Sequence, residues 1–165
     1  MTIQVHPFKA LIHKDSEVLI LGTFPSLKSF DNDFYYSHPK NQFWGILSDI
    51  FNEVAVTQVE RKQLLKNNKI ALWDIVKSCE RKNSSDSNLK NVKVHDLNLL
   101  IEDYKNIKAI LFTGKKSLYF YEKYHKSMDK IIEYLPSPSP AYASLSKEEK
   151  TKIYKSVFEK IGILK

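Results

Sequence analysis

The chain has 165 residues, of which 42% are hydrophobic and 27% are charged, and its formal net charge is +7. These values fit one globular domain over residues 1–165 and exclude an intrinsically disordered chain. A sequence pI of about 9.3 favours a polyanionic partner such as nucleic acid, although a solvated lysine-rich surface gives the same charge balance.

Cysteine content and apolar patterning bear on the cellular compartment. The single cysteine, Cys79, excludes an internal disulfide, and a lone cysteine is more often a small buried hydrophobe than a nucleophile. No apolar run approaches the roughly 20 residues of a membrane span, and residues 1–18 lack the apolar core of a signal peptide. We therefore expect a cytoplasmic protein without a membrane segment.

The first strong element along the chain is the apolar run Val18–Leu21, which ends at Gly22. Before it, His6-Pro7-Phe8 predicts an extended or turn segment that packs over the sheet. The run itself predicts a strand buried on both faces of a parallel sheet. A polar and aromatic loop follows, and Pro39 opens a predicted helix that ends near Phe51. Because ligand crevices lie beyond the carboxyl ends of parallel strands, a pocket is expected at this loop.

The rest of the chain alternates between predicted helices and strands. Helices are expected after the capping signals at Thr57, Asp96 and Ser146, and a further helix is expected to begin at Lys115. Strands are expected at Ile70–Val76, Ile107–Phe112 and Ile131–Leu135. The polar stretch from Ser78 to Asn91 predicts a surface loop. The last helix is expected to bury Ile153, Val157, Phe158 and Ile161. This alternation predicts the α/β class: a three-layer α/β/α domain with a mainly parallel four-stranded sheet.

Several familiar sites are absent from the sequence. None of the four glycines forms a GxGxxG or Walker pattern, and there is no HExxH motif, Cys/His cluster or serine nucleophile elbow. The histidines are scattered and each is more often structural than a ligand; they are His6, His13, His38, His95 and His125. The sequence therefore predicts neither a metal nor a cofactor.

Residues suited to chemistry gather instead at the ends of predicted strands and at one helix start. They are Gly22-Thr23-Phe24-Pro25, His38–Trp44, Asp74 and Leu135–Tyr142. Aromatic rings stack on bases, and an Asn amide both donates and accepts hydrogen bonds. A rigid Pro/Ser loop presents hydroxyls and amides to phosphates, and an aromatic beside it can fill the gap left by an extruded base. Base flipping requires these parts.

Each of these residues also has a structural explanation, and the residues alone leave both explanations open. The alternatives are a core position for Phe43 and Trp44, a helix cap for Asn41, turn formation for Ser137 and Ser139, and an exposed aromatic pair for Tyr35 and Tyr36.

Four motifs, LGTFPS, YYSHPKNQFW, ALWDIVKSCERKNSSDS and LPSPSPAYA, resemble in order and spacing the deoxyinosine (hypoxanthine) DNA glycosylase branch of the uracil-DNA glycosylase superfamily. The resemblance spans about Glu17 to Ala143, and HPKNQFW and LPSPSP are its more specific pieces. It implies a uracil-DNA glycosylase-like fold and a monofunctional hydrolase that flips a deaminated base, hypoxanthine or uracil, out of double-stranded DNA. Cleavage of the N-glycosidic bond then leaves an abasic site for base excision repair.

The resemblance also implies roles for individual residues. Asn41 and Thr23 border the scissile bond as catalytic residues. The base-binding residues are Phe43, which stacks on the flipped base, with Tyr36, His38, Phe24 and Asp74. The DNA-binding residues are Ser137, Ser139, Pro140, Tyr142, Gly114 and Lys115. Tyr142 is the candidate wedge, with Pro140 or Ala141 as alternatives.

One departure from the family pattern affects the mechanism. Many members carry Asp or Asn just after the glycine of the first strand, where this chain has Thr23. Asn41 is then the best candidate to hold the water, but an amide cannot accept its proton, so a largely dissociative path is expected. Asp74 and Asp86 are the nearest carboxylates by motif position. Either could fill the acid/base gap or hydrogen-bond the base, and neither is expected to do so alone.

Three other functions compete with deaminated-base excision by a monomer. They are a catalytically weak nucleic-acid-binding domain of the same fold, a mismatch-specific uracil/thymine DNA glycosylase, and a small-molecule enzyme acting on nucleosides.

Overall fold

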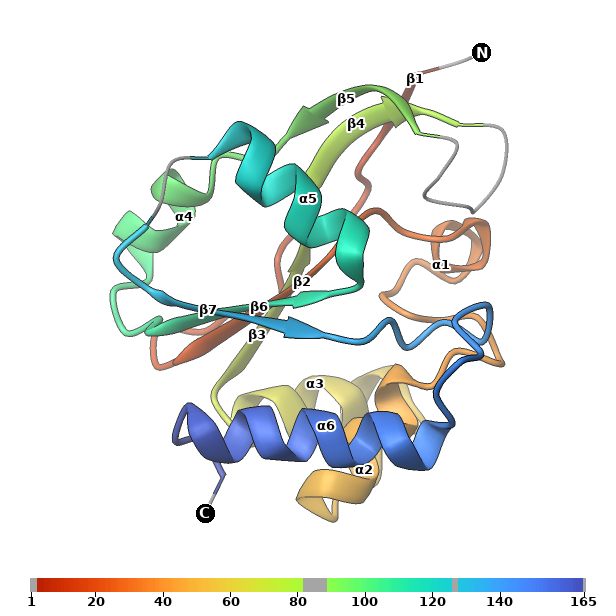
Figure 1. The fold of residues 1–165 in the computed structure, drawn as a ribbon, viewed down its shortest axis with the longest axis vertical. Coiled ribbons are helices and arrows are strands. Elements are labelled where there is room, and N and C mark those ends of the chain that lie inside the picture. Colours follow the sequence, from red (N-terminus) through yellow and green to blue (C-terminus); the bar gives the residue numbers. More distant parts are fainter. Residues whose placement is uncertain (1–2, 82–88, 126–127, 165) are drawn as a thin grey trace.

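A parallel sheet of four strands forms the centre of the molecule (Figure 1). The structure is a computed structural model that describes residues 3–81, 89–125 and 128–164. The sheet consists of β2 (Val18–Gly22), β3 (Ile70–Asp74), β6 (Ala109–Thr113) and β7 (Ile131–Leu135) in the order β3-β2-β6-β7. Every neighbouring pair is parallel, so the predicted α/β class and four-stranded sheet are confirmed.

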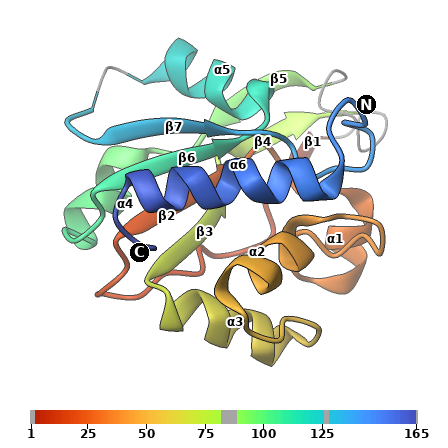
Figure 2. The same ribbon diagram turned by 60° about the horizontal axis from the view of Figure 1, so that its bottom comes forward.

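Helices cover both faces of this sheet (Figures 1 and 2). One face carries α2 (Phe43–Phe51), α3 (Gln58–Asn67) and α6 (Lys147–Lys160), and the other carries α4 (Leu97–Asp103) and α5 (Lys115–Tyr124). A short helix, α1 (Leu27–Asn32), follows β2. The three layers are those that the alternation of elements predicted.

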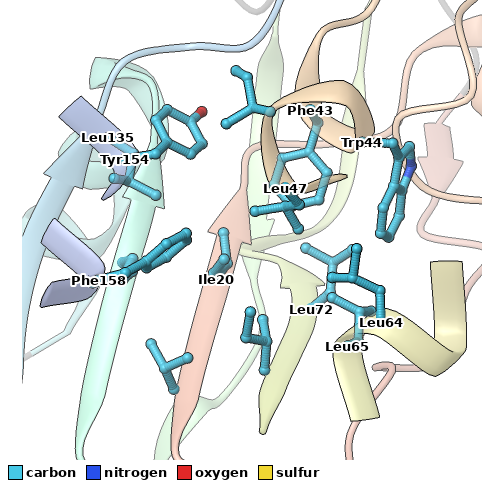
Figure 3. Packing of buried hydrophobic residues seen from close by; sticks show 14 of the residues in the cluster. Ile20, Phe43, Trp44, Leu47, Leu64, Leu65, Leu72, Leu135, Tyr154 and Phe158 are labelled. Atoms are coloured by element: carbon cyan, nitrogen blue, oxygen red, sulfur yellow. The ribbon is translucent and has the colours of Figure 1, made fainter. Parts of the chain in front are cut away.

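Strand β2 shows why this sheet is buried on both sides. Val18 and Ile20 belong to the core under α2, α3 and α6, whereas Leu19 and Leu21 belong to the core under α4 and α5. All four side chains are fully buried, because successive residues of a strand point to opposite faces. Figure 3 shows the first core, where Phe158 packs near Ile20.

A second, antiparallel sheet was not predicted. It consists of β1 (Ile3–Val5), β4 (Val76–Glu80) and β5 (Lys90–Val94) in the order β1-β4-β5. The expected strand Ile70–Val76 is therefore wrong at its end: β3 stops at Asp74, and the chain turns into β4. The expected surface loop from Ser78 to Asn91 is partly strand, and its Ser84, Ser85, Asp86 and Ser87 lie outside the described residues.

The capping boxes that the sequence predicted at Thr57 and Ser146 are both present. Two other local predictions are corrected. The helix expected from Pro39 begins at Phe43, because the Asn41 side chain accepts the Phe43 N–H at 2.9 Å in a turn that precedes the helix. The segment after Pro25, expected to be loop throughout, contains α1, which Ser26 caps by accepting the Ser29 N–H.

The buried stripe of α6 matches the expected one at Phe158 and Ile161, which are both buried, and differs elsewhere. Ile153 is 37% exposed, Val157 is half-buried, and the positions that face the sheet are Lys150, Tyr154 and Phe158, each fully buried. These three residues recur every four positions, the spacing of one helix face. A lysine in such a stripe breaks the hydrophobic pattern, which is why the sequence favoured another register.

Candidate active site

A cavity of about 620 Å³ opens beyond the carboxyl ends of the parallel strands. This volume lies within the range of small-molecule pockets. Four parts of the chain line it. They are the stretch from the end of β2 to the residues before α2 (Gly22, Thr23, Phe24, Pro25, Ser26, Ser29, Tyr35, Tyr36, His38, Asn41), the end of β3 (Asp74), the end of β6 (Thr113) and the loop after β7 (Ser137, Pro138, Ser139, Pro140, Ala141, Tyr142). These segments gather at one end of the sheet in Figures 1 and 2.

Two polar side chains approach the main chain closely at Gly22, which lines the cavity. A Cβ at this position would lie 2.5 Å from Asp74 Oδ1 and 2.7 Å from the Tyr36 hydroxyl, with Thr113 Oγ1 at 3.4 Å. Any larger residue would displace at least one of the first two groups. Glycine is therefore required here for the carboxylate and the phenol each to approach the main chain of β2.

Tyr36 forms one aromatic wall. Its hydroxyl is 2.9 Å from Thr113 Oγ1, and its ring stacks on Phe43 with centroids 4.1 Å apart and an interplanar angle of 18°. A φ of 50° places Tyr36 in the left-handed region, which is uncommon for a bulky residue and occurs at functional sites.

Phe43 does not take the place expected of it. It is fully buried, lies outside the cavity lining, and faces the core with Leu47 (Figure 3). Of this stacked pair, Tyr36 borders the cavity and Phe43 supports it from behind. The apolar periodicity of α2 explains the difference, because it places Phe43 on the buried face of the helix.

Asn41 has both of the properties that the sequence left as alternatives. Its Oδ1 accepts the Phe43 N–H at 2.9 Å, so it caps the first turn of α2, and it also lines the cavity. Both roles are compatible, because the carboxamide keeps its NH₂ donors for a second partner.

Thr23 is 5% exposed and lines the cavity. Within the described residues its Oγ1 has no hydrogen-bond partner. An unsatisfied buried hydroxyl costs roughly 1–3 kcal/mol, and a polar ligand would remove that cost. Thr23 Oγ1 is therefore available to a bound molecule.

Asp74 is held by two histidines. His6 Nε2 donates to Asp74 Oδ2 at 2.9 Å, and His95 Nδ1 donates to the Asp74 main-chain oxygen at 2.9 Å. Burial lowers the pKa of His95 to about 4, so this ring is neutral at pH 7. Both histidines were expected to be structural, and their scattered positions gave no signal, because the antiparallel sheet alone brings them to Asp74.

The loop after β7 is tied to the segment before α2. The Gln42 N–H donates to Pro138 O at 2.9 Å, and the fully buried Lys150 donates to Gln42 Oε1 at 2.8 Å and to Ser139 O at 3.1 Å. Burial lowers the pKa of the Lys150 ammonium. Tyr154 adds a hydrogen bond of 2.6 Å to Pro136 O. These contacts fix the loop over the cavity.

The remaining expected site residues fall into two groups. His38 and Phe24 line the cavity with Ser137, Ser139, Pro140 and Tyr142, and Pro140 and Ala141 are exposed at its rim. Gly114 and Lys115 lie outside the lining but at the same end of the sheet: Gly114 donates to Leu135 O at 2.8 Å, and the exposed Lys115 begins α5.

Residues 3–81, 89–125 and 128–164 contain no group of three or more His, Cys, Asp or Glu that could hold a metal ion. In the same part of the chain no helix combines the length and apolarity that crossing a bilayer requires.

Known proteins resemble this chain in both sequence and fold. A hypoxanthine DNA glycosylase of Methanosarcina barkeri (strain Fusaro / DSM 804) is 37% identical over 112 residues, 67% of this chain and 71% of that protein. A hypoxanthine DNA glycosylase of Methanosarcina acetivorans is 33% identical over 153 residues, 92% of this chain and 96% of that protein. A Methanosarcina acetivorans protein whose structure was solved by solution NMR superposes on this chain with a TM-score of 0.82. The two chains are 30% identical, and the superposition covers 97% of this chain and 99% of the other.

The fold and the site define an α/β domain with a cavity at the carboxyl edge of a parallel sheet, lined on one side by a Pro/Ser loop. The family model described as the uracil DNA glycosylase superfamily matches residues 10–161. The chain belongs to this superfamily, as the sequence motifs indicated.

Proposed function

We propose that this protein is a monofunctional DNA glycosylase that removes deaminated bases, hypoxanthine first and uracil second, from double-stranded DNA. The observation that carries the proposal is the meeting of Asn41, Thr23 and Asp74 in one cavity under the Pro/Ser loop. The relatives named hypoxanthine DNA glycosylases support the choice of base. A repair role places the protein inside the cell, and one molecule suffices for one lesion, so we expect a monomer.

The cavity suits a nucleotide that enters base first. A base swung out of duplex DNA stays attached to its sugar and phosphates, which remain at the rim. Asp74 is 4% exposed and lies deep beside Gly22, so it would meet the far edge of the base. Tyr36 would stack on the base, with Phe43 behind it.

The reaction needs a water but no covalent intermediate. The bond between C1′ and the base nitrogen breaks and leaves its electron pair on the base, an oxocarbenium-like sugar forms, and a water adds to C1′ and releases its proton to solvent. Asn41 would position this water through its carboxamide, which cannot act as a base. Stabilisation of charge on the departing base and the sugar would supply much of the acceleration.

The surface around the cavity would hold the DNA backbone. Ser137 and Ser139 present hydroxyls, Gly114 and Lys115 begin α5 at the same end of the sheet, and the net charge of +7 favours phosphates. Tyr142 lines the cavity and Pro140 is exposed at its rim, so either can enter the stack that the flipped base leaves.

The test uses duplexes that contain a single inosine, uracil or xanthine, followed by alkaline cleavage of abasic sites. Strand breaks at inosine support the proposal. Breaks only at uracil in G·U pairs would favour a mismatch-specific uracil/thymine glycosylase. Binding without breaks would identify a nucleic-acid-binding domain that has lost turnover, and base release only from free nucleosides would identify a nucleoside hydrolase.

A further inference from the structure

We propose that His6 is a positioning residue that engages one carboxylate oxygen of Asp74 and leaves the other to the cavity, and that this single acceptor selects hypoxanthine over adenine and guanine. The inference rests on the proposed function. It assigns the origin of base selectivity to a contact between the N-terminal segment and the end of β3.

The family match does not indicate this contact, because His6 lies before the matched residues. His6 directly follows β1 and lies outside residues 10–161, which the family model matches. Pairing of β1 with β4 brings the histidine to the strand ends. The segment before β2 therefore contributes to a site whose other parts come from the family-matched domain.

The surroundings of the His6 ring fix its orientation. Its side chain is 1% exposed, and its centroid lies 5.6 Å from that of Phe8 and 5.9 Å from those of Phe24 and Tyr35. Nδ1 lies 3.2 Å from the N–H of Phe8 and 3.0 Å from its carbonyl oxygen. Nδ1 therefore has a hydrogen-bond partner both as a donor and as an acceptor, and the ring keeps Nε2 directed at Asp74.

The two oxygens of Asp74 then have different environments. Oδ2 lies 2.9 Å from Nε2, and because a carboxylate oxygen only accepts, Nε2 carries the proton. Oδ1 lies on the side of Gly22, 2.5 Å from where a Cβ would stand, and Gly22 lines the cavity whereas His6 does not. Asp74 thus presents one acceptor to a ligand and has the other engaged.

A single acceptor distinguishes hypoxanthine from both normal purines of DNA. Hypoxanthine presents one N–H at N1 beside its carbonyl, so one carboxylate oxygen satisfies it. Adenine has a lone pair at N1, which a carboxylate repels. Guanine presents N1–H and a neighbouring amino group, a pair that matches a carboxylate with both oxygens free. Because Oδ2 is turned toward His6, which does not line the cavity, the guanine amino group would be left without a partner.

Thr23 supplies the complementary donor. Gly22 pairs with Asp74 in the register of β2 and β3, and Thr23 is the next residue after this pair. Its buried Oγ1, which has no partner among the described residues, can donate to the carbonyl oxygen of hypoxanthine. Thr23 and Asp74 both line the cavity, so one base can meet the donor with its carbonyl oxygen and the acceptor with its N1–H.

The experiment measures recognition separately from cleavage. Duplexes carry 2′-fluoro-2′-deoxyinosine, 2′-fluoro-2′-deoxyguanosine or 2′-fluoro-2′-deoxyadenosine opposite thymine, because the fluorine disfavours the oxocarbenium-like sugar and blocks excision. Their dissociation constants are compared for wild type, His6→Phe, His6→Gln, Asp74→Asn and the double variant. His13→Gln is the control, since His13 is exposed in the same N-terminal segment. Unfolding midpoints and single-turnover excision of inosine accompany each measurement.

We expect His6→Phe to lower the preference for inosine over guanosine about tenfold, within the discrimination that a good hydrogen-bonded pair provides. His6→Gln should restore part of this preference, because its amide donates to Oδ2. In the Asp74→Asn background, His6→Phe should cause no further loss. If His6→Phe does not fold, His6→Met provides a second apolar variant whose flexible side chain fills irregular space.

Two results would overturn the inference while leaving the proposed function intact. The first is a His6→Phe variant that is as stable as wild type and keeps the wild-type preference for inosine over guanosine. The second is a loss of preference from His6→Phe that is as large in the Asp74→Asn background as in the wild-type background. If wild type neither prefers nor excises inosine, the proposed function itself is wrong and the inference with it.

Discussion

The main-chain N–H of Gln42 donates a hydrogen bond of 2.9 Å to the carbonyl oxygen of Pro138. This contact joins two motifs that lie far apart in the chain, one before α2 and one after β7. It places Asn41 and Ser137 on the walls of the same cavity, which is the arrangement that excision of a flipped base requires.

Asn41 is expected to affect excision and stability through different atoms. Asn41→Ala should lower single-turnover excision of inosine at least about tenfold, the low end of what a positioned catalytic group supplies, and leave duplex binding nearly intact. It should also destabilise the fold by about 1 kcal/mol through the lost cap. Asn41→Ser keeps a capping oxygen, so it should retain stability and still lose excision. Recovery of excision in Asn41→Ser would assign Asn41 a structural role only.

Tyr142 is tested as the wedge. Tyr142→Ala should slow excision from a well-paired duplex about tenfold more than from single-stranded DNA, since one stacked aromatic is worth roughly 1–3 kcal/mol. Tyr142→Phe keeps the ring and should behave like wild type. An equal loss on both substrates would remove Tyr142 as the wedge and turn attention to Pro140, which is exposed at the rim.

Lys115 is expected to contact phosphate without selecting sequence. Lys115→Ala should weaken binding of lesion-containing and undamaged duplexes alike, and it should reduce the slope of log K against log salt by about 1. Lys105→Ala is the matched control, because this exposed lysine precedes β6 and so lies at the opposite edge of the sheet. Equal slopes for both variants would place the DNA elsewhere.

Lys150 holds the Pro/Ser loop from below. Lys150→Met fills the same space but leaves Gln42 Oε1 and Ser139 O without their donor, which should cost roughly 1–3 kcal/mol in the free energy of unfolding. Duplex binding should weaken as the loop loosens. Lys155→Met, an exposed position on the same helix, should change neither quantity. Denaturant unfolding and binding isotherms measure both effects.

His95 predicts a pH dependence of stability. Burial lowers its pKa in the folded protein from 6.5 to about 4, so the unfolded chain binds more protons between these values. The free energy of unfolding should therefore fall as the pH decreases through this window. His95→Gln keeps a donor for Asp74 O without a titrating ring, so its stability should vary less over the same range. Identical pH profiles in denaturant unfolding would contradict the prediction.

Local sequence chemistry alone determined much of this fold. Four apolar runs predicted the four parallel strands, and the Ser/Thr and Glu pairs at Thr57 and Ser146 predicted two helix starts, because a capping box is satisfied within four residues. The strand-end motifs likewise predicted where the cavity lies, since parallel strands present their carboxyl ends at one edge. The family followed from these motifs as well.

Contacts between distant segments required the tertiary structure. The antiparallel sheet depends on pairing of β1 with β4, so nothing near His6 in the sequence indicated that its ring binds Asp74. The different positions of Phe43 and Tyr36 could not be predicted from the sequence, because only packing decides which of two stacked aromatic rings faces the core and which faces the cavity. Lys150 lies in a hydrophobic stripe for the same reason: its partners, Gln42 and Ser139, reach it only once the chain has folded.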